Sequence, residues 1–327
     1  MALLLRESHL HELLSMRDLV PLMEGALASL STGGAVQPVR SVVPVRTHSG
    51  FLAVMPAYLS GQEALGLKAV AFYPGNTARG LHTHMATILL LDAATGALLA
   101  AMDGRLITEM RTAAVSAAAT KHLARADSGI LAFLGAGVQA RGHLRALVEV
   151  FHPETLTVWS RTATSAGQFA REVVGPFGVR VAVKGSPEEA VRGADVICTL
   201  TSSQTAVLHG AWLQPGAHIN AVGACRPDWR ELDSEAITRS RLFVDSRAAA
   251  VVEAGDIVLP ITEGVIGEDH IRAEIGEVFA GTHPGRTTPQ EITLFKSLGQ
   301  AVEDVATAQF AYQRALARGI GEELSLT

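Results

Sequence analysis

The chain has 327 residues, of which 48% are hydrophobic, 18% charged and 5% aromatic, and its formal net charge at pH 7 is -5. This length favours two domains, and this composition is that of a compact enzyme and not of a disordered or fibrous chain. The negative charge, together with the absence of a long Lys or Arg run, argues against nucleic acid as a partner. No stretch approaches the ~20 uninterrupted apolar residues that cross a bilayer, so no membrane partner is expected.

Two regions with different patterns of hydrophobic residues follow one another along the chain. The first hundred residues predict one helix, over residues 18–30, followed by the strands of a mixed sheet. Ser15 and Asp18 resemble a capping box at the start of that helix. An Ala-rich stretch predicts a connecting helix from about residue 108 to 125. The strands expected in this region cover residues 39–46, 50–59, 67–73 and 84–92.

From Ser128 onward, strand-like runs alternate with helical stretches, which is typical of βαβ units and a parallel sheet. Ser186, Pro187 and Glu189 place a cap, a first-turn proline and a capping glutamate in register. The expected strands cover residues 129–134, 155–159, 179–183, 195–200, 217–222 and 242–245. A last helix, over residues 298–317, offers Leu298, Val302, Val305 and Phe310 for one buried face and is expected to return to the first domain.

These patterns predict an α/β protein with a doubly wound Rossmann sheet and a second, α+β domain. We place the α+β domain at residues 1–120, joined by a C-terminal helix at residues 301–327, and the Rossmann domain at residues 121–300. The two cysteines, Cys198 and Cys225, are too few for a disulfide framework, so a cytoplasmic location is expected.

A glycine-rich turn follows the first strand of the predicted Rossmann domain. Residues 130–134 run into a G-x-G-x-x-A pattern at Gly135, Gly137 and Ala140, and a helix is predicted over residues 141–151. Gly135 permits the tight turn, Gly137 allows close approach of a pyrophosphate, and the helix N-terminus faces the phosphates. The bare pattern also occurs in ordinary strand–helix turns, but its place in a series of βαβ units favours a dinucleotide site.

The second strand of the domain bears on the choice of dinucleotide. An NAD enzyme usually ends this strand with an acid that binds the ribose 2′-hydroxyl, whereas a 2′-phosphate needs hydroxyl and guanidinium donors. Here Ser160, Arg161 and Thr162 follow the strand and no acid is present. The sequence therefore predicts NADPH, with NADH less expected, although Arg161 could also be a solvated turn residue.

A small amino or imino acid has a carboxylate that the enzyme must hold, and bidentate Arg suits this task better than Lys. Composition alone does not choose among the candidates, each of which could be a surface charge. The candidates are Arg40, Lys68, Arg105 and Arg111.

A series of segments, in order along nearly the whole chain, resembles the ornithine cyclodeaminase and mu-crystallin family. Within the family the resemblance is closest to the mu-crystallin, or ketimine reductase, branch. The segments are residues 37–45 (QPVRSVVPV), 54–58 (VMPAY), 102–104 (MDG), 111–117 (RTAAVSA), 135–140 (GAGVQA), 216–223 (GAHINAVG), 226–232 (RPDWREL) and 295–299 (FKSLG).

The resemblance implies roles for particular residues. Arg40 and Arg111 fall on positions that bind the substrate carboxylate, and Lys68 falls beside the carboxylate and the imine. It also implies a homodimer formed through the sheets of the first domains. The positions that it implies for NADPH are Ala136, Gly137, Val138, Gln139, Ser160, Arg161, Thr162, Thr199 and Thr201, beside Gly135 of the turn, with His84, Val222 and Ser297 as further cofactor-side positions.

The implied activity is NADPH-dependent reduction of the C=N bond of cyclic imino acids, such as piperideine-, pyrroline- or sulfur-containing ring carboxylates. Cyclodeaminases of the family carry an acid where Cys225 stands and another where Ala53 stands, which weakens the cyclodeaminase alternative. Asp228 could replace the first acid, or it could be a turn residue that orients a neighbouring arginine. No metal site is expected, because His82 and His84 lack a third ligand.

Two alternatives to the reductase remain open at this stage. One is an ornithine cyclodeaminase or an amino-acid dehydrogenase of the same fold. The other is a protein that binds thyroid hormone in the presence of NADPH, or a lens crystallin, if the chain is of animal origin.

Overall fold

The computed structural model describes residues 2–325, which fold into two compact units. Of the described residues, 2–111 together with 300–325 form one unit, and 112–299 form the other. Helix α3 (Gly104–Leu123) runs from the first unit into the second. Among residues 2–325, no helix combines the length and the apolar character needed to cross a bilayer.

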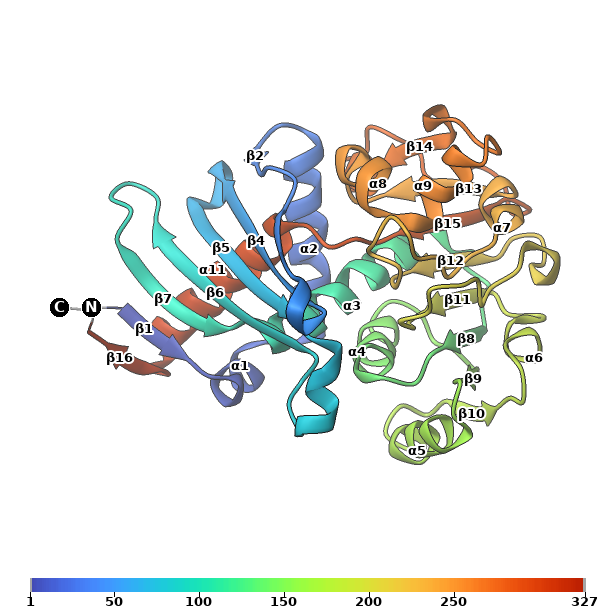
Figure 1. The fold of residues 1–327 in the computed structure, drawn as a ribbon, viewed down its shortest axis with the longest axis horizontal. Helices are drawn as coiled ribbons and strands as arrows, with labels where there is room; N and C mark the ends of the chain where they lie inside the picture. Colours follow the sequence, from blue (N-terminus) through green and yellow to red (C-terminus); the bar gives the residue numbers. More distant parts are fainter. Residues whose placement is uncertain (1, 326–327) are drawn as a thin grey trace. The chain divides into compact units, whose positions relative to one another are not determined.

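The first unit is built on a mixed sheet with the strand order β16-β1-β7-β6-β5-β4-β2, with β3 also paired to β4 (Figure 1). Its central strands, from β4 to β7, are antiparallel, whereas β1 and β7 are parallel. The strands are β1 (Ala2–Leu5), β2 (Ala35–Val36), β3 (Ser41–Val45), β4 (Gly50–Leu59), β5 (Ala64–Phe72), β6 (His84–Asp92), β7 (Leu98–Asp103) and β16 (Glu322–Leu324), and the helices are α1 (Glu7–Leu13), α2 (Met16–Ser31) and α11 (Ala301–Arg318).

The two faces of this sheet are unlike. Because side chains alternate along a strand, one face of β4 presents Ala53, Met55 and Ala57, all buried. Helix α11 lies across this face and packs on β4, β5 and β6 (Figure 1). Lys68 of β5 lies opposite Met55 and therefore points to the same covered face. The fold thus carries a lysine into the apolar layer between sheet and helix.

The second unit contains an eight-stranded sheet in the order β10-β9-β8-β11-β12-β15-β13-β14, in which every pair is parallel. The order reverses at β8, and in such folds ligands bind at the carboxyl ends of the strands beside this point. The strands are β8 (Ile130–Leu134), β9 (Thr155–Trp159), β10 (Arg180–Val183), β11 (Val196–Thr199), β12 (His218–Ala221), β13 (Ser240–Val244), β14 (Ile271–Glu274) and β15 (Ile292–Lys296), and the helices are α4 (Val138–Leu147), α5 (Ala163–Val173), α6 (Pro187–Val191), α7 (Ser234–Thr238), α8 (Arg247–Glu253), α9 (Gly255–Thr262) and α10 (Ile275–Phe279).

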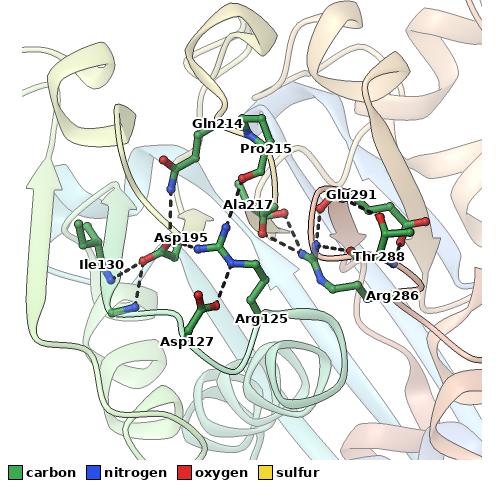
Figure 2. Close-up of polar contacts among 12 residues, drawn as sticks. Arg125, Asp127, Ile130, Asp195, Gln214, Pro215, Ala217, Arg286, Thr288 and Glu291 are labelled. Atoms are coloured by element: carbon green, nitrogen blue, oxygen red, sulfur yellow. Dashed lines mark hydrogen bonds and ion pairs between the residues drawn. The ribbon is translucent and has the colours of Figure 1, made fainter.

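Polar contacts fix the opposite, amino-terminal edge of this sheet (Figure 2). The Asp195 carboxylate accepts hydrogen bonds from the backbone N–H groups of Gly129 and Ile130, at 2.9 and 3.0 Å, just before β11 begins. It also pairs with Arg125 at 2.7 Å. Satisfied polar groups of this kind hold the start of β8 against the start of β11. The candidate site lies at the other, carboxyl-terminal edge of this sheet.

The predicted fold class is confirmed, whereas several element predictions are wrong. The first region does not begin with one helix, because β1 and α1 precede α2, and β7 follows the predicted strands. The helix after the glycine turn occupies Val138–Leu147 and not residues 141–151, since it starts directly after Gly137. Strands β14 and β15 were not predicted. The Ser186 cap is confirmed, because its side chain accepts a hydrogen bond from the Glu189 N–H.

Candidate active site

The glycine turn between β8 and α4 has the shape that a phosphate site needs. Gly135 has φ +114°, which L side chains rarely adopt, and a Cβ there would lie 2.6 Å from the carbonyl oxygen of Leu200. Gly137 precedes the first residue of α4, and no side chain caps the helix there. A Cβ on Gly137 would meet nothing within 4 Å. The first N–H groups of α4 therefore face open space, where an anion can bind.

Other predicted residues lie around this turn. Ala136 is buried, Gln139 is half-buried and Val138 is exposed. Arg141, which we did not predict, donates to the carbonyl oxygens of Ala136 and Gly137, at 3.1 and 3.0 Å. This arginine fixes the turn, and its charge is paired with the Glu172 carboxylate. In the sequence, the only sign of this role is that Arg141 lies four residues after Gly137, one helical turn away.

The three residues that follow β9 lie at the surface. Ser160 is half-buried, and Arg161 and Thr162 are exposed. The Thr162 hydroxyl lies 2.6 Å from that of Ser165. Arg161 has no hydrogen bond or ion pair with any residue that the structure describes, so its guanidinium is available to a ligand.

A buried glutamate that sequence reasoning missed lies beneath the ends of β11 and β12. The predicted residues Thr199 and Thr201 donate their hydroxyls to the Glu231 carboxylate, at 2.8 and 2.6 Å. Burial, followed by the charge of Asp256, raises the pKa of Glu231. The hydroxyl hydrogens of the two threonines are therefore already used within the protein.

Three further predicted positions differ in their surroundings. Val222 is half-buried directly after β12. Ser297, directly after β15, is 2% exposed, and its Oγ has no hydrogen-bond partner among residues 2–325. Asp228 is exposed, and its carboxylate lies 3.3 Å from Arg226 Nε. This geometry agrees with the alternative in which Asp228 orients a neighbouring arginine.

In the first unit, two predicted cations share a buried pair of acids from α11. Lys68 Nζ lies 2.6 Å from Asp304 Oδ2. Arg111 Nε lies 3.0 Å from Asp304 Oδ1, and its Nη1 lies 2.7 Å from Glu303 Oε2. All four side chains are at most 5% exposed. Sequence reasoning missed both acids, which look like ordinary surface charges of a helix.

The charges of this cluster alter one another's protonation. Burial lowers the pKa of Lys68 to about 8; the charge of Asp304 opposes this, and the charges of Arg111 and Arg40 reinforce it. Burial would raise the pKa of Asp304, but Arg111 and Lys68 lower it overall. Lys68 is therefore still mostly protonated at neutral pH, although its pKa lies only slightly above 7.

Arg40 and His84 lie near the same lysine. Arg40 is half-buried directly before β3, and its charge acts on Lys68. His84 begins β6, with its ring 4.7 Å from that of Phe72. Desolvation, and then the charge of Lys68, lower the pKa of His84. The structure thus brings together three of the four candidate cations, Arg40, Lys68 and Arg111, whereas Arg105 pairs with Glu7. With two acids beneath the three cations, the cluster retains an excess positive charge suited to a carboxylate.

Comparison with known proteins identifies the family of the chain. The family model for the ornithine cyclodeaminase/mu-crystallin family matches residues 2–319. The chain belongs to this family. Rat ketimine reductase mu-crystallin is 49% identical over 297 residues, which are 90% of this chain and 91% of the rat protein.

The solved structures of one reductase and one dehydrogenase are similar to this chain over almost their whole length. The Thermococcus litoralis Delta(1)-pyrroline-2-carboxylate reductase, in complex with NADH and L-proline, is 45% identical with a TM-score of 0.96, covering 98% of this chain and 100% of that one. An archaeal alanine dehydrogenase, solved as a dimer with NAD, is 35% identical with a TM-score of 0.95, covering 100% and 99%. The chain is an oxidoreductase of the ornithine cyclodeaminase/mu-crystallin family.

Proposed function

We propose that the protein reduces the C=N bond of a small cyclic imino acid to give the saturated cyclic amino acid, with NADPH as the reductant. The observation that carries this proposal is the buried cluster of Lys68 and Arg111 on Glu303 and Asp304, with Arg40 beside it. A carboxylate is the ligand whose charge and shape suit such a set of ammonium and guanidinium donors.

The residues present fit a dinucleotide. Gly135 leaves no room for a Cβ, and the open space above Gly137 meets the uncapped start of α4. When bound, the dinucleotide supplies a hydride to the carbon of the C=N bond. The residues of the first unit then have two tasks: the arginines hold the carboxylate, and the Lys68 ammonium donates a proton to the nitrogen as the carbon receives the hydride, leaving a neutral amine on Lys68.

The preference for NADPH over NADH rests on the segment after β9. Arg161 is exposed and without a partner among the described residues, Ser160 and Thr162 provide hydroxyls, and no acid is present. The T. litoralis relative was solved with NADH, so cofactor choice within this family needs a direct measurement. We expect a lower Kd for NADPH than for NADH, and Arg161→Ala should remove this difference. Equal affinities in the unaltered protein would contradict the NADPH assignment.

The substrate is tested with a panel. NADPH oxidation is followed with pyrroline-2-carboxylate, piperideine-2-carboxylate and a sulfur-containing ring ketimine, and in parallel NAD+ is supplied with ornithine, with alanine and with proline. Turnover of a cyclic imino acid supports the proposal. Preferential turnover of ornithine or alanine would instead assign a cyclodeaminase or an alanine dehydrogenase, the activity named for the archaeal relative.

We also propose a homodimer formed through the uncovered face of the first sheet. Val43, Leu52, Ala71 and Met85 lie opposite one another across β3, β4, β5 and β6. Val43 is 57%, Leu52 38% and Met85 47% exposed. An antiparallel sheet facing water usually carries polar residues on that side, so this apolar row suits a second copy. Light scattering should show a dimer, and Leu52→Glu should weaken it; a monomeric protein would contradict the assignment.

A cytoplasmic location completes the proposal. Cys198 is buried, Cys225 is exposed, and neither forms a disulfide in the part of the chain that the structure describes. A reducing compartment maintains this state. Localisation of a fluorescent fusion would test it.

A further inference from the structure

One carboxylate ties together the ends of two neighbouring strands in the second unit. Glu231 Oε1 accepts from the backbone N–H and from the hydroxyl of Thr201, both at 2.6 Å. Its Oε2 accepts from the Thr199 hydroxyl and from the Gly223 N–H, both at 2.8 Å. Thr199 is the last residue of β11, and Gly223 lies two residues after β12. A buried carboxylate with four donors is a rigid support for both strand ends.

A second acid and a lysine hold this carboxylate in place. Asp256 Oδ1 accepts from the Glu231 and Leu232 N–H groups, at 2.7 and 3.0 Å, and its Oδ2 lies 3.0 Å from Lys296 Nζ. Lys296 also donates to the Gly223 carbonyl oxygen. All three charged side chains are fully buried. Gly223 is therefore held through both its N–H and its carbonyl oxygen. A Cβ at this position would lie 2.3 Å from the Thr201 carbonyl oxygen.

The supported strand ends adjoin the phosphate turn. A Cβ on Gly135 would meet the Leu200 carbonyl oxygen at 2.6 Å and Thr201 Cγ2 at 3.3 Å. In a doubly wound sheet the two halves of a dinucleotide lie on opposite sides of the first strand, here β8. Ser160 and Arg161 follow β9 on one side, and the Glu231-supported ends of β11 and β12 lie on the other. Glu231 thus supports the half of the dinucleotide site that lies on the opposite side of β8 from the adenosine half.

We propose that Glu231 is a positioning residue for the nicotinamide half of the dinucleotide, acting through Thr199, Thr201 and Gly223, with Asp256 and Lys296 as its support. The inference rests on the proposed function only in assuming a nicotinamide dinucleotide. Glutamine at this position has the same shape, but its amide keeps one acceptor oxygen and turns an NH2 group toward two donors. One buried backbone N–H, of Thr201 or of Gly223, then loses its acceptor.

The experiment compares whole and half ligands on the full chain. Binding of NADPH and NADH, and of their adenosine halves, adenosine 2′,5′-bisphosphate and AMP, is measured by titration calorimetry. Glu231→Gln should raise the Kd of the preferred dinucleotide by about tenfold or more and leave the Kd of its adenosine half unchanged. The matched control is Glu235→Gln, an exposed glutamate of α7, which should change neither Kd.

Two results for Glu231→Gln would overturn the inference. One is an equal loss of affinity for the dinucleotide and for its adenosine half, which would indicate that the whole site is disturbed. The other is no loss of affinity for either ligand. If Glu231→Gln is not recovered as a folded protein, Thr199→Val, which removes one buried donor to Glu231, decides by the same comparison with a smaller effect. No imino acid enters these measurements, so a failure to reduce imino acids would count against the proposed function alone.

Discussion

Replacing Lys68 by methionine separates the stability of the protein from its activity. Burial lowers the pKa of Lys68 from 10.5 to about 8, even with Asp304 beside it. At 1.36 kcal/mol per pH unit, this difference means that the buried ammonium opposes folding by about 3 kcal/mol at neutral pH. Methionine has a similar length and no charge, and two cations, Arg111 and Arg40, remain to balance the two acids Glu303 and Asp304. We expect Lys68→Met to unfold at higher urea concentration than the unaltered protein while imino-acid turnover is lost.

The assay is urea unfolding followed by circular dichroism, beside NADPH oxidation with the best substrate of the panel. The pH dependence gives a second check: the folded-state pKa is the lower one, so the penalty is complete below about 8 and fades as pH rises toward 10.5. The stability gap between variant and parent should close over that range. Lys121→Met, on an exposed lysine of α3, should change little. A Lys68→Met protein that is less stable than its parent would refute the reasoning, and one that keeps full turnover would remove Lys68 from the site.

Three other predictions concern the cluster around Lys68 and the glycine turn after β8. The kcat/KM for the imino acid should be constant below a pH of about 8 and fall as pH rises through it, because Lys68 then loses its proton; a flat profile to higher pH would contradict the need for the ammonium. Arg111→Leu should lower turnover at least about 10²-fold while the Kd for NADPH stays unchanged, as kinetics and titration would show; unchanged turnover would remove the carboxylate clamp. Gly137→Ala should abolish dinucleotide binding with little change in melting temperature, whereas Gly135→Ala should also lower that temperature, since only Gly135 combines a positive φ with a close backbone contact.

The parts of the fold that could be read from the sequence are those with local signals. Thr155–Trp159 is a strand with the predicted bounds, because an apolar run is closed on both sides by polar residues. The turn at Gly135 and Gly137 was readable because its conformation needs particular residues within a few positions. Strand β15, by contrast, was not predicted; it is a run of only five residues that ends in the charged residue Lys296.

The charged partners at the sites could not be read, because their roles depend on contacts between distant segments. Glu303 and Asp304 interrupt the apolar periodicity of α11, and the prediction of one buried face fails there, since residues 301–308 are buried on every side. Glu231 and Asp256 each lie in loops or at helix starts, where acids are ordinarily solvated. Only the folded chain shows that these acids neutralise or organise predicted residues such as Lys68 and Thr201.

The acids beneath Lys68 and Arg111 come from a helix far along the chain: Glu303 follows Arg111 by 192 positions. During synthesis, the strands that carry the lysine leave the ribosome long before α11 does. Until that helix arrives, the two cations lack the counter-charges of Glu303 and Asp304, and the face of β4 and β5 that it covers is bare. The buried cluster of cations and acids is therefore completed last. An early stop codon just before α11 would spare the whole parallel sheet and remove both acids of the carboxylate site that we propose.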